Sequence, residues 1–281
     1  MVRKVDVPAE LMHGDADEGY GPVADAFRRN FTERGGIGAA CAIYRDGRKL
    51  VDLWGGYRDG ITRTPWREDT MVVMFSTTKG VASLSLAHSG GLLDYDERVV
   101  AYWPQFAWRG KGQITVRQLL SHQAGPTVID IPLTAITGEL GLNAATLEAL
   151  VGPAQLPSGG LVDVLLKTPV VCSLGDMKPT ADLPFGGSAN AAFATPGNGG
   201  SFGMADPDTG IGYCYGPNRL GFGLIGQREL ALRDTLYRDV LGERPQRPTH
   251  RQPPPEAPAG DLQPATPRRS DPEHPPLGAP P

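Results

Sequence analysis

Two stretches, far apart in the chain, each consist of a pair of apolar runs joined by a turn. Residues 37–60 hold two such runs around Arg45-Asp46-Gly47, and residues 199–218 hold two more around the turn at 206–210. Apolar runs separated by an Asp-Gly turn or by a short Gly-containing loop predict β-hairpins. Because a hairpin joins antiparallel neighbours, we expect an antiparallel sheet built from both ends of the chain.

Helical patterns flank these hairpins. Residues 21–36 have apolar side chains at helical spacing, residues 227–242 place most of their leucines along one helical face, and residues 114–125 predict a short helix. Residues 126–184 contain many small residues and no clear core pattern. The chain is therefore expected to be an α+β protein, with an antiparallel sheet flanked by helices.

The last part of the sequence differs from the rest. Thirteen of the 27 prolines of the chain lie in residues 245–281, where few large apolar side chains remain. Such a segment cannot bury enough surface to offset the entropy of ordering, so we expect a disordered, partly polyproline tail after a domain at 1–244. A ligand for a proline-binding domain is the alternative interpretation of this tail.

Composition excludes several classes of protein. A net charge of −4 and the lack of a long basic run argue against nucleic acid as a partner. No apolar stretch is long enough to span a membrane, and residues 1–20 lack the apolar centre of an export signal, so a cytoplasmic location is expected. Cys41, Cys172 and Cys214 are odd in number and are expected to be buried or half-buried thiols. The five histidines show no metal-ligand spacing, and no metal or other cofactor is expected.

The stretch "FSTTKG" holds the residues most suggestive of chemistry. Ser76 and Lys79 are three positions apart, which places both side chains on one face of a helix and within hydrogen-bond reach. A lysine can remove a serine proton only as the neutral amine, and burial lowers its pKa toward that form. Residues 80–87 are small or apolar and carry no charge, which indicates a helix buried on most sides. The pattern therefore favours a nucleophile and its base.

A simpler interpretation stays open on the spacing alone. Ser76 could be only a helix N-cap and Lys79 only a surface residue of the first turn. A Ser-x-x-Lys spacing also arises by chance in a chain of this length. The uncharged helix that follows is the observation that favours the functional interpretation.

Several blocks of the sequence closely resemble the serine beta-lactamase-related family, which includes esterases, penicillin-binding DD-peptidases and class C beta-lactamases. These blocks are "FSTTKG", "GGLLDYDERVVAYWPQF", "ITVRQLLSHQAG" and "TPGNGGSFGMADPDTGIGYCYGPNRLGFG". The resemblance covers about residues 20–125 and 183–242 and is closest to the esterase-like branch. It implies a beta-lactamase/transpeptidase-like fold.

The resemblance also implies roles for individual residues. Ser76 would be the acylated nucleophile and Lys79 its base. Thr195-Pro196-Gly197 falls where the family has Lys-Thr-Gly or His-Thr-Gly on the strand beside the active site, so the backbone N–H groups of Asn198 and Ser76 would form an oxyanion hole. Glycines such as Gly197 and Gly199 let a strand approach substrate closely, although a plain glycine-rich turn would have the same sequence.

Two departures from the family pattern affect the expected activity. Thr195 replaces a lysine or histidine and so removes a positive charge or proton donor. The family tyrosine that relays a proton is missing, because no tyrosine lies between Tyr102 and Tyr213. The middle of the chain is also shorter than the helical portion of the family, so a truncated helical subdomain is expected at 126–184. His122 matches a family histidine that we interpret as structural.

The sequence thus predicts a serine hydrolase, foremost a carboxylesterase that acts on a small-molecule ester through an acyl-enzyme. A catalytically impaired or non-catalytic remnant that acts in binding is the alternative. A beta-lactam hydrolase or DD-peptidase is a further alternative, which the missing export signal disfavours. The acyl and alcohol groups of the substrate and the oligomeric state are left open.

Overall fold

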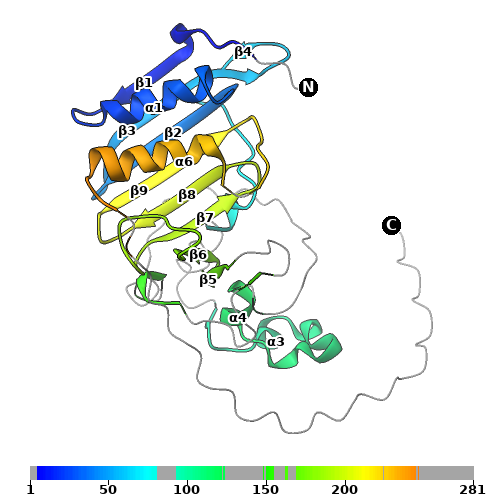
Figure 1. Ribbon diagram of the computed structural model, residues 1–281. Helices are drawn as coiled ribbons and strands as arrows, with labels where there is room; N and C mark the ends of the chain where they lie inside the picture. Colours follow the sequence, from blue (N-terminus) through cyan, green and yellow to red (C-terminus); the bar gives the residue numbers. More distant parts are fainter. Residues whose placement is uncertain are drawn as a thin grey trace, which may run out of the picture.

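The computed structural model of the chain describes residues 5–80, 93–121, 123, 148, 150–154, 162–163, 169–223, 225–244 and 246. Its strands are β1 (Met12–Ala16), β2 (Gly38–Arg45), β3 (Arg48–Asp59), β4 (Thr64–Pro65), β5 (Val171–Ser173), β6 (Asp176–Lys178), β7 (Phe193–Gly197), β8 (Ser201–Asp206) and β9 (Ile211–Pro217). They form one sheet in the order β1-β3-β2-β9-β8-β7-β6-β5, with β4 paired to β3 (Figure 1). Every pairing between these strands is antiparallel.

Both hairpins predicted from the sequence are present. Strands β2 and β3 pair up to Arg45 opposite Arg48, and the two residues between them, Asp46 and Gly47, have φ values of 51° and 80°. Positive φ at both central positions is what a type I′ turn requires, and Asp-Gly is among the sequences that provide it. Strands β8 and β9 pair up to Asp206 opposite Ile211, as the second turn predicts.

The two hairpins meet at the centre of the sheet. Strand β2 pairs along its length with β9, with Cys41 opposite Tyr215. The prediction that the sheet is built from both ends of the chain is therefore confirmed.

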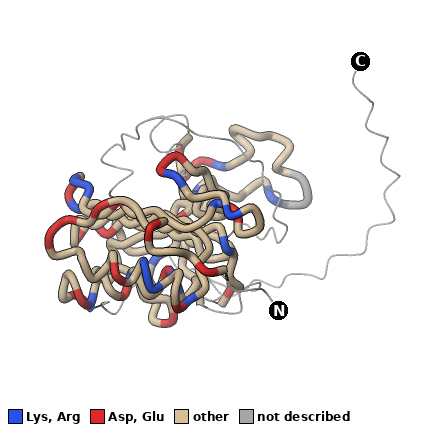
Figure 2. Tube along the Cα trace, turned by 90° about the horizontal axis from the view of Figure 1, so that it is seen from above, with Lys and Arg blue, Asp and Glu red and all other residues tan. Residues whose placement is uncertain are grey.

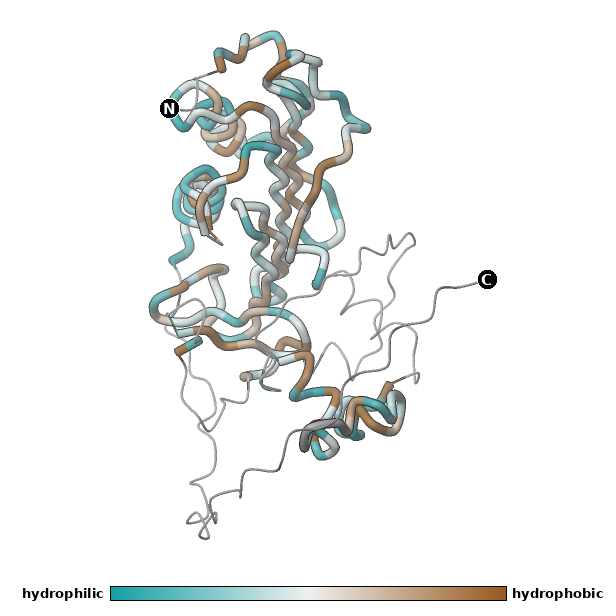
Figure 3. Tube along the Cα trace, turned by 90° about the vertical axis from the view of Figure 1, so that its right-hand side faces the viewer, coloured by the Kyte–Doolittle hydropathy of each residue, from teal (hydrophilic) through white to brown (hydrophobic). Residues whose placement is uncertain are grey.

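Helices cover one face of this sheet. They are α1 (Gly21–Thr32), α6 (Gln227–Asp234) and η3 (Thr235–Val240), a π-helix that continues α6, and a 3₁₀ turn, η1 (Ala9–Leu11), precedes β1. Figure 1 shows α1 and α6 lying across the same face, and Figure 3 shows them on one side of the sheet when it is viewed edge-on. The helix predicted at 21–36 is shorter than expected, because the backbone leaves the helical conformation before Gly35, where φ is 63°. The helix predicted at 227–242 is present as α6 and η3.

The hydrophobic core lies between these helices and the sheet. Phe27 from α1, Leu232 from α6 and Leu236 from η3 are almost fully buried against aromatic side chains of β8 and β9. The one buried ion pair among the described residues is also here. Arg233 Nε donates to Glu229 Oε1 over 2.7 Å, and the two side chains are 4% and 0% exposed. A charge buried this deeply is tolerated only when it is paired.

The described helical part is small. It consists of α3 (Val99–Tyr102), η2 (Pro104–Gln113, a 3₁₀ segment) and α4 (Val116–Leu120). A capping box between Thr115 and Gln118 begins α4, which confirms the short helix predicted at 114–125. These elements share a small apolar cluster formed by Val99, Phe106 and Val116. The fold is α+β, with a truncated helical part, as predicted.

Two findings correct the sequence-based predictions. Within residues 126–184, where the sequence indicates one helical piece at 143–152 and no clear core pattern, the described residues include a hairpin, β5–β6, that was not predicted. Cys214 is exposed rather than buried, because the two tyrosines beside it on β9 point to the core and alternation turns Cys214 to the other face. Cys41 is buried and Cys172 half-buried, as expected.

Some predictions fall outside the described residues. These are the helix at 81–92 that follows Lys79, His122, and the proline-rich tail except for Gln246. Along the described trace, Lys and Arg are interspersed with Asp and Glu (Figure 2). Among the described helices, none is both long enough and apolar enough to cross a bilayer.

Candidate active site

The face of the sheet opposite α1 and α6 is lined by small residues on three neighbouring strands. On β8 and β9, aromatic side chains point to the core, so alternation leaves small side chains on the other face. With their neighbours on β7, these residues are Gly197, Ser201, Gly203, Cys214 and Gly216. The segment at 72–77 lies on this surface: a Cβ atom on Gly216 would lie 2.8 Å from Met74 Sδ, and one on Gly203 would lie 3.1 Å from Thr77 Cγ2. The lack of side chains lets the segment approach the sheet closely.

Two hydrogen bonds hold this segment in place. Ser201 Oγ donates to the carbonyl oxygen of Met74 over 2.7 Å, and Thr77 Oγ1 lies 3.1 Å from Ser201 Oγ. Because Ser201 has one hydroxyl proton, Thr77 is the donor in the second bond. Thr77 and Ser201 are both buried. The bonds fix the backbone on either side of Ser76.

Ser76 follows a strained residue and precedes a helical turn. Phe75 has a φ of 49°, a value that costs a bulky residue about 1–3 kcal/mol. Residues 77–80 are helical, and the backbone N–H of Lys79 donates to the carbonyl oxygen of Ser76 over 2.8 Å. This confirms the prediction of a helix that begins next to Ser76. Strain of this kind is typical of positions where the backbone must present a functional group.

The side chains of Ser76 and Lys79 are in direct contact. Lys79 Nζ donates to Ser76 Oγ over 2.6 Å, so the predicted hydrogen-bond reach is confirmed. Partial burial lowers the pKa of the Lys79 amine, with a small opposing contribution from the Cys172 thiol. Lys79 is half-buried rather than fully exposed. The same contact can carry a proton from oxygen to nitrogen when the amine is uncharged.

Gly197, Asn198 and Gly199 lie at the end of β7 and in the turn to β8. Gly197 lies close against the segment at 72–77. A Cβ atom on Gly197 would collide with the carbonyl oxygen of Met74 and would lie 2.8 Å from Thr77 Oγ1. Asn198 is exposed, and the turn is completed by Gly199 and Gly200 with φ values of 88° and 103°. The glycine-rich strand end is therefore beside the segment that carries Ser76. The oxyanion role of the Asn198 N–H stays a prediction.

A buried carboxyl group lies near Ser76 and Lys79, and the sequence analysis did not identify it. Asp176 on β6 lies next to Thr195 on β7, and Thr195 Oγ1 donates to Asp176 Oδ1 over 2.6 Å. A Cβ on Gly80 would lie 2.6 Å from Thr195 Oγ1 and 3.2 Å from Asp176 Oδ1. Burial raises the pKa of Asp176 to about 6, against the opposing effects of the Thr195 hydrogen bond and Lys178. The pair thus lies one helical turn from Ser76, against the residue after Lys79.

The tyrosines nearest in sequence to the strand end are not in this site. Tyr213 and Tyr215 are 3% and 1% exposed and belong to the core on the opposite face of the sheet. Burial raises the pKa of both hydroxyl groups. Neither side chain is placed to exchange a proton with Ser76.

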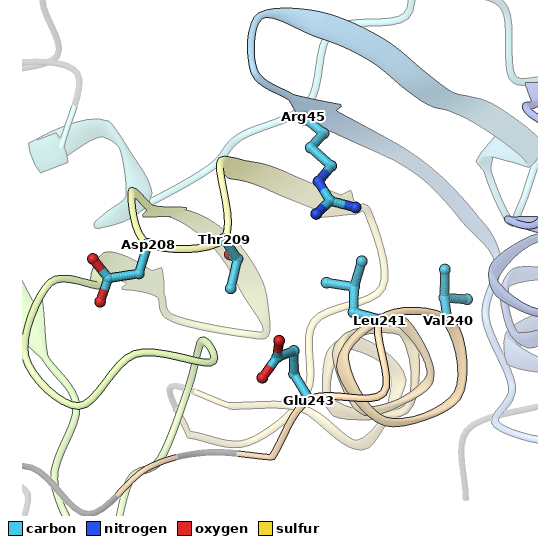
Figure 4. Close-up of a pocket in the computed structure, with 6 residues that line it drawn as sticks. All are labelled: Arg45, Asp208, Thr209, Val240, Leu241 and Glu243. Carbon is cyan, nitrogen blue, oxygen red and sulfur yellow. The ribbon is translucent and has the colours of Figure 1, made fainter.

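A separate pocket lies at another part of the surface. It has a volume of about 190 Å³, and its lining comes from the β2 end, the β8–β9 turn and the end of η3 (Figure 4). The lining residues are Arg45, Asp208, Thr209, Val240, Leu241 and Glu243. None of the predicted site residues lines it. Within the described residues, no cluster of His, Cys, Asp and Glu could hold a metal ion.

Comparison with known proteins gives one family and several related structures. Residues 23–136 match the family model described as Beta-lactamase. A curated relative, "Esterase/beta-lactamase LipL" of Mycobacterium tuberculosis (strain ATCC 25618 / H37Rv), is 40% identical over 114 residues, which is 40% of this chain. The matched part spans 27% of the length of that relative.

Solved structures match a larger part of the chain at lower identity. A penicillin-binding protein homolog from Caulobacter crescentus has a TM-score of 0.66 and 21% identity, and the match covers 79% of this chain and 97% of the other. A family VIII carboxylesterase has a TM-score of 0.63 and 24% identity, with 81% of this chain and 99% of the other covered. At these identities the likeness shows the fold. Residues 23–136 therefore match the Beta-lactamase family model in sequence, and the chain shares the fold of these solved structures.

Proposed function

We propose that this chain is a serine hydrolase that cleaves small carboxylic esters through an acyl-enzyme on Ser76. The observation that carries the proposal is the 2.6 Å contact between Ser76 Oγ and Lys79 Nζ, together with the burial that lowers the pKa of the amine. A serine hydroxyl is a weak nucleophile until a neighbouring base removes its proton. Lys79 is the described side chain placed to do so.

The reaction follows from the roles of these groups. Ser76 Oγ attacks the ester carbonyl carbon while its proton passes to Lys79 Nζ, and the N–H groups of Ser76 and Asn198 bind the oxyanion. The carbon–oxygen bond to the alcohol then breaks, and the leaving alcohol takes the proton from Lys79. Water then gives a proton to Lys79 Nζ as its oxygen attacks the acyl carbon. The bond from the acyl carbon to Ser76 Oγ breaks, Ser76 Oγ takes the proton back from Lys79, and the carboxylic acid leaves.

The relatives and the surroundings of the strand end support an ester substrate. The curated relative is named an esterase as well as a beta-lactamase, and one structural neighbour is a carboxylesterase. The loop at 218–223 is joined to Gly199 by backbone hydrogen bonds of 3.1 and 2.8 Å. It carries Leu220 and Phe222, which are 53% and 104% exposed. Apolar side chains beside the predicted oxyanion site suit an uncharged acyl or alcohol group.

A non-catalytic remnant is the second candidate. It is favoured by the position of Tyr213, Tyr215 and Tyr237 in the core, because these are the three tyrosines that follow Tyr102 in the sequence. Loss of a general acid–base group typically lowers the rate by about 10²–10⁴. A slow enzyme and an inactive binding protein are therefore the two outcomes to separate.

Labelling with a fluorophosphonate probe separates them. The wild-type protein is expected to gain one covalent adduct by intact-mass measurement, and Ser76→Ala is expected to gain none. Lys79→Met should slow the labelling at least 100-fold, because the hydroxyl loses its base. Lys49→Met, which removes an exposed lysine, is the matched control and should label like the wild type. Labelling that persists in Ser76→Ala, or a folded wild-type protein that never labels, would overturn the proposal.

A further inference from the structure

The carboxyl group of Asp176 is the most unusual polar group of the site face. The residue is 3% exposed, its Oδ1 accepts the Thr195 hydroxyl over 2.6 Å, and its Oδ2 has no hydrogen-bond partner within the part of the chain that the structure describes. A carboxyl group that only fixed a threonine would not need a buried oxygen without a partner, which costs stability. A pKa of about 6 leaves the group mostly ionised at pH 7 to 8.

Lys178 acts on the Asp176 carboxylate only through the electrostatic effect of its charge. No ion pair with Asp176 occurs among the described residues. Lys178, on the same strand, instead directs its Nζ to the carbonyl oxygen of Leu150 over 2.5 Å and to that of Ala191 over 3.5 Å. Burial lowers the pKa of Lys178 to about 8, which weakens it further as a counter-charge above that pH. The electrostatic potential of the Asp176 carboxylate therefore acts on any charged group that binds near it.

The position of the charge connects it to the proposed reaction. Asp176 and Thr195 lie beside Gly80, where a Cβ atom would be 2.6 Å from Thr195 Oγ1 and 3.2 Å from Asp176 Oδ1. Gly80 is four residues after Ser76, so it lies on the same face of the helical turn as Ser76 and directly after Lys79. Further along β7, Gly197 abuts the segment on either side of Ser76. An ester bound at Ser76 and along β7 would lie within several ångströms of the carboxylate.

We propose that the Asp176–Thr195 pair makes this site selective for uncharged esters, by repelling substrates that carry a carboxylate near the scissile bond. This inference rests on the proposed function and names its substrate class. At a separation of roughly 8 Å and an effective dielectric constant of about 40–60, the repulsion corresponds to about a three- to sixfold loss of kcat/KM for an anionic substrate. Thr195 carries no positive charge that could attract an anionic substrate, and its hydroxyl proton is donated to Asp176.

The titratable groups around Asp176 allow its charge to be followed by pH. Cys172 on β5 and Lys178 on the same strand interact electrostatically with Asp176, and Lys79 directly precedes Gly80 on the helical turn beside it. Burial raises the pKa of Cys172 to about 12, and that of Lys178 is about 8, so neither group titrates between pH 5 and 7. Titration of Lys79 alters the attack on every ester alike, and it cancels in the ratio of two substrates. A change of that ratio near pH 6 therefore reports the charge of Asp176.

The test compares two esters of equal length, p-nitrophenyl butyrate and the p-nitrophenyl monoester of succinic acid. For the wild type at pH 8, kcat/KM is expected to favour the uncharged butyrate. In Asp176→Asn the ratio of the two kcat/KM values should fall about three- to sixfold. In the wild type the ratio should fall about two- to threefold between pH 7 and pH 5.5, a range in which Lys178 stays mostly protonated and the succinate carboxyl mostly ionised, and in Asp176→Asn it should stay flat. Asp94→Asn, which removes an exposed carboxylate, is the control and should leave the ratio unchanged.

The outcomes are distinguishable. Ser76-dependent hydrolysis with the same ratio in the wild type and in Asp176→Asn would overturn the inference and leave the proposed function standing. No Ser76-dependent hydrolysis of either ester would overturn both. If Asp176→Asn fails to fold, the pH dependence of the ratio in the wild type decides alone, and a ratio that is constant from pH 5.5 to 7 overturns the inference.

Discussion

The two faces of the sheet are filled by different kinds of side chain. On the face under α1 and α6, large apolar residues such as Phe27 and Phe202 are almost fully buried. The charged side chains of Glu229 and Arg233 form a buried ion pair there. On the other face, glycines lie under the Ser76 segment, Phe75 has a positive φ, and an oxygen of Asp176 has no hydrogen-bond partner among the described residues. The first face provides stability, while the second retains backbone strain at Phe75 and, beside Gly80, a carboxyl group that forms no ion pair with any described residue. Strain and a buried charge persist in a folded protein only when packing elsewhere supplies enough stability to offset their cost.

The largest expected effect on stability lies on the core face. Glu229→Gln leaves the Arg233 guanidinium buried without its counter-charge, so the free energy of unfolding should fall by about 3–5 kcal/mol in urea titrations. Asp239→Asn removes one partner of an exposed ion pair nearby and should change the free energy of unfolding little. Equal effects of the two substitutions would contradict the contrast between the faces.

On the site face, Asp176 should make stability depend on pH with a sign opposite to that of an ordinary salt-bridged carboxylate. Its folded-state pKa of about 6 lies above its ordinary value of 3.8, so its stabilising contribution is complete below about pH 4 and is lost as the pH rises through 6. The loss is on the order of 3 kcal/mol. Asp176→Asn should therefore gain stability relative to the wild type between pH 4 and 7.

Thermal unfolding of both proteins across this pH range measures that difference. Comparing the two proteins isolates Asp176 from carboxylates whose pKa is lowered, such as Asp96 beside Arg117. A difference that stays constant with pH would show that the carboxyl group is not penalised by burial.

The smallest expected effect concerns the contact between the site segment and the sheet. Ser201→Ala removes the hydrogen bonds to Met74 and Thr77 and should cost about 1–2 kcal/mol in the free energy of unfolding. Because these bonds fix the backbone around Ser76, labelling by the fluorophosphonate probe should also slow. The decrease in rate should exceed the decrease in the folded fraction of the protein. Thr62→Ala, in an exposed turn, is the control and should leave the labelling rate unchanged. Labelling at the wild-type rate in Ser201→Ala would show that the bonds do not position Ser76.

Local sequence patterns were sufficient to predict those elements in which the turn residues and the spacing of apolar residues indicate the same structure. The Asp46-Gly47 turn and the alternation on either side of it predict the β2–β3 hairpin, and Phe27 and Phe31 at helical spacing predict α1. The β5–β6 hairpin escaped detection because its turn, Leu174-Gly175, has positive φ at a leucine, which no turn preference predicts. Its strands are three residues each, too short for a clear alternating pattern.

By itself, the sequence determined the antiparallel hairpins, the helices that cover them and the pairing of Ser76 with Lys79, because each depends on residues close together in the chain. The tertiary structure decided which face of the sheet receives the Ser76 segment and that Asp176 and Thr195 lie against Gly80. Those contacts join residues about a hundred positions apart. Their energies come from close packing, burial and charge, which exist only once the strands are side by side.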